Sequence, residues 1–185
     1  MKSTLILALA FATSSVFVST EKKVNVEQSK IVWKGHKVTG SHDGHITLEN
    51  GTLIFNDKNT LTGGNFTMDM STLTVTDLDG EMKGKLEWHL KSDDFFGVDK
   101  HEKSTFVITK VTGTNGVYKV TGDLTIKGIT HPNTFEMKVS GNTAKADIKV
   151  NRTKYDIKYG SASFFDDLKD KAIYDEFDLF VNLKF

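Results

Sequence analysis

The chain has 185 residues, with 24 Lys and Arg against 24 Asp and Glu, a formal net charge of zero and no cysteine. At about 100 to 200 residues per domain, this length predicts a single domain. Charge neutrality argues against a nucleic-acid partner, and the lack of cysteine excludes disulfides, thiolate-ligated metals and thiol nucleophiles.

Residues 1–19 have the pattern of a secretory signal peptide. Lys2 supplies a positive start, an apolar run extends from Leu5 to Ala12, and small residues then offer a cleavage region without fixing the site. A membrane anchor would need about 20 continuous apolar residues, and Thr13 to Ser15 interrupt this run. We therefore expect a periplasmic or secreted bacterial protein whose single domain spans 20–185, with no transmembrane span.

Three histidines lie close together early in the mature chain. His36, His42 and His45 flank Asp43, and imidazoles are common zinc and copper ligands. His42 and His45 are an odd number of residues apart, so a regular strand would point them to opposite faces. The alternatives are a metal-binding or enzymatic barrel that uses these histidines, and a polar hairpin with hydrogen-bonded imidazoles.

Two segments interrupt an otherwise strand-like pattern. In residues 80–97, Met82, Leu86 and Leu90 recur at four-residue spacing, which predicts a short amphipathic helix. Residues 161–174 predict a second short helix or an ordered loop. We expect these segments to cap the ends of a β-structure.

Alternation of apolar and polar residues predicts strands elsewhere, at 118–127, 134–139, 144–150 and 177–185. Turn-forming residues separate the strands, and Gly128 through Pro132 is predicted as one of these turns. Such a succession indicates an antiparallel meander that closes into a barrel or a sandwich. The nucleophile-elbow and phosphate-loop motifs are missing from the sequence, so we expect no enzyme and no cofactor.

The chain carries 13 Phe, two Trp, four Tyr and five Met, more than the wall of a minimal barrel requires. A barrel of about eight strands is either filled by its own side chains or left open for one small ligand. Two interpretations therefore stand: an open interior with a lid, and a filled barrel of a structural or stress protein whose ends are sealed by aromatic residues.

Five segments, at 29–38, 39–46, 90–106, 122–132 and 150–155, resemble in order the YceI-like family of exported, lipocalin-like polyisoprenoid-binding proteins. The resemblance implies an all-β fold, an eight-stranded antiparallel lipocalin-like β-barrel with one or two short helices capping the ends. It also implies an apolar tunnel that holds an isoprenoid lipid, such as a quinone or polyprenyl tail. The chain departs from the family's Asp-Arg-x-x-Phe-Gly form at Asn151, Tyr155 and Asp156.

Residues and resemblance together predict a binding protein for an isoprenoid or quinone-type lipid, and the sequence leaves the oligomeric state open, a dimer included. Arg152, the one arginine of the chain, is the candidate for binding the ligand's head group, and a salt bridge to Asp156 or Asp175 is the structural alternative. The expected tunnel-lining residues are apolar or aromatic: Trp33, Phe66, Met68, Trp88, Phe95, Phe96, Phe106, Ile108, Leu124, Ile126, Phe135, Met137, Ile148, Tyr155, Phe164, Phe165, Phe177 and Leu179.

Overall fold

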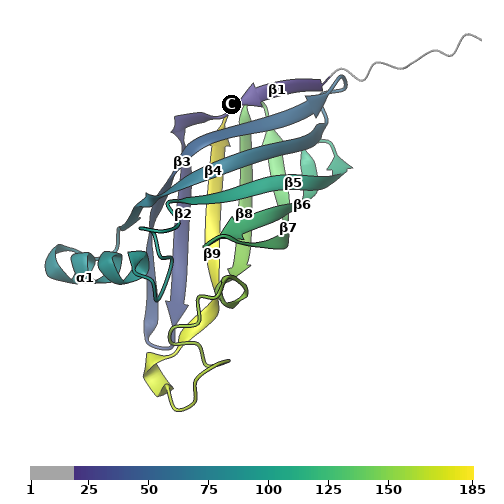
Figure 1. The fold of residues 1–185 in the computed structure, drawn as a ribbon. Coiled ribbons are helices and arrows are strands. Elements are labelled where there is room, and N and C mark those ends of the chain that lie inside the picture. Colours follow the sequence, from purple (N-terminus) through teal and green to yellow (C-terminus); the bar gives the residue numbers. More distant parts are fainter. Residues whose placement is uncertain (1–18) are drawn as a thin grey trace, which may run out of the picture.

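Strands dominate residues 19–185, the part of the chain that the computed structural model describes (Figure 1). A single α-helix, α1, joins two of the strands in this range, and two short 3₁₀ helices, η1 and η2, precede the last strand. In chain order the elements are β1 (Ser19–Lys23), β2 (Asn25–Lys37), β3 (Gly40–Asn56), β4 (Leu61–Val75), α1 (Gly80–Lys91), β5 (Lys103–Thr114), β6 (Val117–Ile126), β7 (Ile129–Ser140), β8 (Thr143–Asn151), η1 (Arg152–Tyr155), η2 (Lys169–Lys171) and β9 (Ile173–Lys184).

The sheet closes on itself. Its strands follow the order β1-β3-β2-β9-β8-β7-β6-β5-β4, every pairing is antiparallel, and an additional pairing of β3 with β4 completes the ring. The short β1 pairs with the end of β3 that β2 does not reach, so β1 and β2 lie one after the other along the same edge of β3. Val24, which connects β1 to β2, donates its amide to Gly51 O at 2.8 Å. The eight strands β2 to β9 therefore form the barrel, and the predicted eight-stranded antiparallel fold is confirmed.

The hairpin of β6 and β7 illustrates how local chemistry sets the register. Lys127 and Gly128 both have positive φ, as a two-residue turn between antiparallel strands requires, and Ile126 pairs with Ile129 across it. The predicted turn at Gly128–Pro132 is therefore too long, because Pro132 lies inside β7. The missing amide is tolerated there because β8 pairs with β7 only from Met137 onward.

Helix α1 lies beside the barrel and packs against β4 with its C-terminal half (Figure 1). Leu90 is buried, but Met82 is 62% exposed, so the predicted apolar face is engaged at one end only. Glu87 fastens the helix to β4, because its carboxylate accepts hydrogen bonds from Thr74 Oγ1 at 2.6 Å and Val75 N at 2.9 Å.

The sequence predicts either a second short helix or an ordered loop for segment 161–174, and the structure has the ordered loop. Its helical part, among the described residues, is the single short turn η2.

The predicted signal peptide falls almost wholly outside the described residues, and its last residue, Ser19, begins β1. Within 19–185, no helix is long and apolar enough to cross a membrane.

Candidate ligand cavity and its mouth

A cavity of about 300 Å³ lies inside the barrel. Residues of β9 line it from Ile173 to Leu183, ten residue steps that span about 33 Å along the strand and about 25 Å along a barrel axis after the usual strand tilt. Such a volume spread over that length is a narrow channel. Its walls are mostly aliphatic and aromatic side chains, so it suits an extended apolar chain.

The two ends of the cavity differ. At the end where the C-terminus lies, Leu53, Phe55 and Leu183 are almost fully buried, and the Phe55 and Phe185 rings pack 5.7 Å apart. At the other end, His36 and His42 line the cavity while about 30% of each side chain remains exposed to solvent. We call this second end the mouth, and it is the end at which the β2–β3 turn and the loop between β8 and β9 lie (Figure 1).

Most of the side chains expected to line a tunnel do line this cavity. They come from seven strands and from the segment after α1, and the alternation of each strand directs them inward. The group consists of Trp33, Phe66, Met68, Phe95, Phe96, Phe106, Leu124, Ile126, Phe135, Met137, Ile148, Phe177 and Leu179, and Arg152 lines the cavity with them.

Five expected residues lie elsewhere. Trp88 is 74% exposed on α1, and Phe164 and Phe165 are half exposed in the loop that follows η1. Ile108 is buried without lining the cavity. Tyr155 is buried as well, with its ring edge-on to His131 at 5.5 Å, where it covers the part of β7 that lacks a partner in β8.

Phe95 and Phe96 form the wall of the cavity close to the mouth. Tight turns follow α1, and Gly97, with φ of 56°, allows the chain to reverse directly after them. Phe96 packs edge-on against Phe177 at 6.4 Å, and the Arg152 guanidinium lies 5.6 Å from the centre of the Phe95 ring. The segment after α1 thus contributes to the same aromatic wall as β9.

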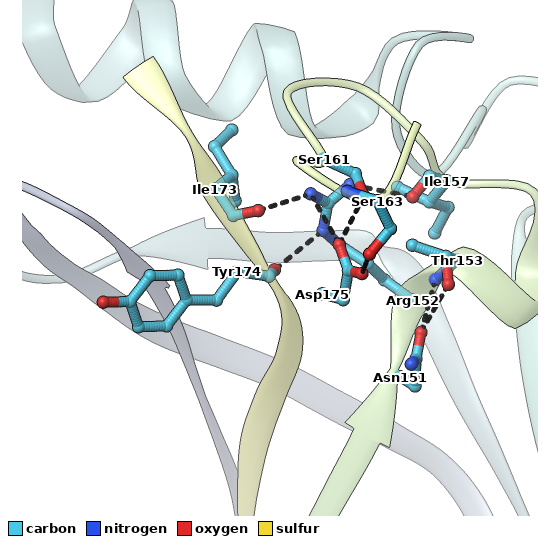
Figure 2. Close-up of polar contacts among 9 residues, drawn as sticks. All are labelled: Asn151, Arg152, Thr153, Ile157, Ser161, Ser163, Ile173, Tyr174 and Asp175. Carbon is cyan, nitrogen blue, oxygen red and sulfur yellow. Dashed lines mark hydrogen bonds and ion pairs between the residues drawn. The ribbon is translucent and has the colours of Figure 1, made fainter. Parts of the chain in front are cut away.

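Arg152 holds the loop at the mouth (Figure 2). Although it is 2% exposed, its Nε donates to Tyr174 O at 3.0 Å, Nη1 to Ile157 O at 2.8 Å and Nη2 to Ile173 O at 2.9 Å. Of the two predicted salt-bridge partners, Asp175 has its Oδ1 3.8 Å from Arg152 Nη2, whereas Asp156 pairs with Lys158. Of the two roles considered for Arg152, these contacts favour the structural one.

The carboxylate of Asp175 completes this network. It accepts hydrogen bonds from the hydroxyls of Ser161 and Ser163, which lie in the same loop (Figure 2). Burial raises the pKa of Asp175, but these two hydrogen bonds and the charge of Arg152 outweigh burial and hold the pKa below its ordinary value. Burial lowers the pKa of Arg152, which stays protonated because an arginine in a protein does not lose its charge. Both ends of the loop are therefore fixed by ionised groups.

The three histidines of the metal hypothesis are held apart. His36 Nε2 is 2.8 Å from Asp178 Oδ2, and His42 Nδ1 is 2.8 Å from Asp77 Oδ2. His45 does not line the cavity. Its pKa is lowered mainly by burial and to a smaller extent by repulsion from Lys30. Among residues 19–185, no group of three or more His, Cys, Asp or Glu side chains is placed to hold a metal ion.

Several lining residues were not expected from the sequence. Alternation along 31–48 and 181–183 is a signal that would have found the apolar ones on β2, β3 and β9. His89 carries no such signal, because its position depends on how α1 meets the barrel. Its Nε2 is buried and has no hydrogen-bond partner among the described residues, and its ring packs edge-on against the rings of Phe95 and Tyr159. The unexpected residues include Ile31, Ile46, Leu48, Met70, Leu73, Leu86, His89, Leu90, Ser104, Asn133, Val181 and Leu183.

A closed antiparallel barrel with a narrow apolar interior defines the lipocalin-like class. The model of the YceI-like domain matches residues 22–185, and the chain belongs to this family. No curated protein matches the sequence.

Solved structures share the fold at low identity. BcnA of Burkholderia cenocepacia is 20% identical, with a TM-score of 0.69 over 86% of this chain and 98% of that one. A polyisoprenoid binding domain from Saccharophagus degradans, implicated in plant cell wall breakdown, is 10% identical, with a TM-score of 0.57 over 87% and 95%. The YceI protein of Campylobacter jejuni is 16% identical, with a TM-score of 0.52 over 98% and 96%.

Proposed function

We propose that this protein binds and carries an amphiphilic isoprenoid lipid, of quinone or polyprenyl type, inside the barrel, and that it does so without catalysis after export to the periplasm or the exterior. The observation that carries the proposal is the narrow apolar cavity that runs along most of the barrel. Membership of the YceI-like family and the fold shared with a polyisoprenoid binding domain support it.

The energetics of such a ligand fit this cavity. Each methylene removed from water contributes about 0.8 kcal/mol, so a long prenyl chain gains affinity from buried area and needs few hydrogen bonds along its length. Met68, Met70 and Met137 line the cavity, and their flexible side chains can adapt to a chain with several conformations. The more polar mouth would then receive the head group.

Organic extraction of the purified protein, followed by mass spectrometry, tests the proposal. We expect a prenylated compound in the extract. A clean extract together with bound metal by elemental analysis would favour the histidine alternative, and a clean extract without metal would favour the filled barrel.

A cavity-filling variant makes the test specific. Gly35 lines the cavity and does not have a positive φ. A Cβ added there would meet, among the described residues, only the Trp33 ring, at 3.9 Å. Gly35→Leu places about four carbon atoms in the channel, and displacing as many ligand carbons at about 0.8 kcal/mol each lowers affinity roughly a hundredfold. Gly63→Leu is the matched control, because Gly63 does not line the cavity and, in the part of the chain that the structure describes, its Cβ would meet only the side chain of Ile54. Equal ligand retention by both variants would contradict binding in the barrel.

A further inference from the structure

Exposed apolar side chains gather around the mouth of the barrel. Val38 is 54% exposed in the β2–β3 turn, Tyr159, Phe164 and Phe165 are about half exposed in the loop after η1, and Tyr174 is 56% exposed at the start of β9. We call these five residues the mouth patch. They come from three separate segments. Exposing these apolar side chains together to water does not stabilise a monomer, so the patch indicates a surface that contacts a partner.

Direct contacts connect the segments of the mouth patch to one another and to the cavity wall. Val38 donates its amide to Ala172 O at 3.1 Å, and the Tyr174 ring stacks on His36 at 6.4 Å. The Tyr159 ring packs edge-on against His89 at 4.5 Å, next to the exposed Trp88 of α1. Because His36, His89 and Tyr174 also line the cavity, the patch is continuous with the apolar interior.

We propose that the mouth patch docks onto the surface of a lipid bilayer, so that a prenyl chain passes between the bilayer and the barrel without crossing water. This inference rests on the proposed function, because a water-insoluble ligand is what requires such contact. Tyrosine and tryptophan favour the membrane interface, since their rings are apolar and their polar atoms can stay hydrated. Tyr159 and Tyr174 of the patch, and Trp88 beside it, have this character.

The size of the mouth patch favours a bilayer over a second copy of the chain. Five half-exposed side chains of roughly 100 Å² each present about 500 Å², whereas a stable protein interface needs about 800 Å² from each partner. Shallow insertion into a membrane surface has no such minimum, and its strength rises with the apolar area inserted.

The charge of the segment that carries four of the five patch residues indicates which membrane the patch fits. Residues 151–175 contain five basic residues, Arg152 and four lysines, and five aspartates, so their net charge is zero. Lys158 lies over the Phe164 ring at 5.2 Å and pairs with Asp156, so this cation is already engaged. Docking should therefore depend on the apolar side chains, require no anionic lipid and vary little with salt.

Flotation with phosphatidylcholine vesicles tests the proposal. We expect the wild-type protein to float with the vesicles, with little change on adding salt or phosphatidylglycerol. The double variant Phe164→Gln, Phe165→Gln should bind at least about tenfold more weakly, because two rings no longer enter the interface. Val38→Gln, in a different segment, should weaken binding in the same direction and guards against a local folding defect in the loop.

Phe180→Gln together with Val117→Gln is the matched control. These exposed apolar residues lie on the outer face of β9 and at the far end of the barrel, so flotation should not change. The proposal is overturned if the wild type does not float, if it floats only with phosphatidylglycerol at low salt, or if the control loses as much binding. A dimer in light scattering that the Phe164 and Phe165 changes dissolve would assign the patch to a second copy instead.

The two proposals fail separately. If the protein does not float but yields a prenylated compound on extraction, the proposed function stands and membrane docking is wrong. If it floats, yields no such compound and takes up none from vesicles doped with a prenylquinone, docking stands and the proposed ligand is wrong.

Discussion

Arg152 performs a task for which lysine is unsuited. Its planar guanidinium donates in three directions to three backbone carbonyls, and these come from both ends of the loop between β8 and β9. A lysine ammonium could reach one or two of these carbonyls, but it could not hold all three in one plane. This geometry accounts for an arginine at this position in a chain whose other 23 basic residues are lysines.

We therefore expect Arg152→Lys to lower the free energy of unfolding by about 2 to 3 kcal/mol, because hydrogen bonds from a buried charge are lost. Thermal melts measure this change, and trypsin should cleave the loop faster at its lysines. Ligand retention per folded molecule should remain as in the wild type. If retention falls while the melting temperature stays the same, Arg152 binds the head group.

His89 carries a polar atom with no evident partner. Within residues 19–185 its buried Nε2 has no hydrogen-bond partner, and a buried polar atom without one costs about 1 to 3 kcal/mol relative to a satisfied group. The surrounding rings of Phe95 and Tyr159 would accept an apolar ring. His89→Phe should therefore raise the free energy of unfolding by about 1 kcal/mol in urea titrations of the ligand-free protein. His89→Gln retains a buried polar group and should bring no gain, so an equal gain in both variants would contradict this explanation.

Among the strands, β6 depends on a glycine for its packing. A Cβ at Gly122 would lie 2.4 Å from Phe106 Cζ and 2.5 Å from Val107 O, so any larger residue displaces a cavity-lining ring and the β5 backbone. Gly122→Ala should destabilise the protein by about 2 to 3 kcal/mol, measured as a lower urea midpoint.

Gly84 in α1 is the control for Gly122. No atom of residues 19–185 outside the helix lies within 4 Å of a Cβ built on Gly84, so Gly84→Ala should stabilise the protein by about 0.5 to 1 kcal/mol through helix propensity. If Gly122→Ala is also neutral or stabilising, Phe106 can move away and the packing at this point is looser than the distances indicate.

The sequence predicts best those elements in which apolar and polar residues alternate regularly. In β6, Tyr118, Val120, Leu124 and Ile126 are buried, as the alternation predicts, because each strand has one face toward the interior. The turn after it is shorter than the sequence predicts, because Pro132 lies within β7 and not in the turn. Whether a strand tolerates proline depends on what pairs with its amide side, which is a tertiary property.

The residues of the cavity and its mouth also fall into those that strand alternation predicts and those whose position depends on tertiary contacts. Strand residues such as Phe106 and Phe135 could be assigned to the interior from alternation alone. Phe164 and Phe165 could not be placed, because their exposure depends on where Arg152 and Asp175 hold the loop. His89 depends in a similar way on the docking of α1 through Glu87.

At the scale of the whole molecule, the barrel has one sealed end and one mouth, and the two are held together by different interactions. Three carboxylates fasten separate elements at the mouth: Asp77 to His42 of β3, Asp175 to the loop, and Asp178 to His36 of β2 and Lys149 of β8. The sealed end is held instead by buried apolar side chains such as Leu53 and Phe55. Acid should therefore act on the two ends differently.

The direction of the acid effect follows from the pKa values. Burial raises the pKa of Asp77, Asp175 and Asp178, but the hydrogen bonds they accept and their cationic neighbours outweigh burial, so each pKa lies below the ordinary 3.8. A group whose pKa is lower in the folded state stabilises the fold above its unfolded pKa, and this contribution is lost as the pH falls through the folded value. We expect the free energy of unfolding to decline below about pH 4.

Hydrogen exchange would locate this loss. From about pH 7 to about pH 3, after correction for the intrinsic exchange rate, protection should fall first in the β8–β9 loop and the β2–β3 turn, while the strands of the sealed end keep theirs. Asp178→Asn keeps an oxygen acceptor but does not titrate, so it should flatten the pH dependence. Asp123→Asn on β6 is the matched control, because the Asp123 side chain has no hydrogen bond or ion pair to fasten another element in the described part of the chain. Uniform loss of protection along the barrel would mean that the mouth does not open as a separate unit, and that the protein unfolds in acid as a whole.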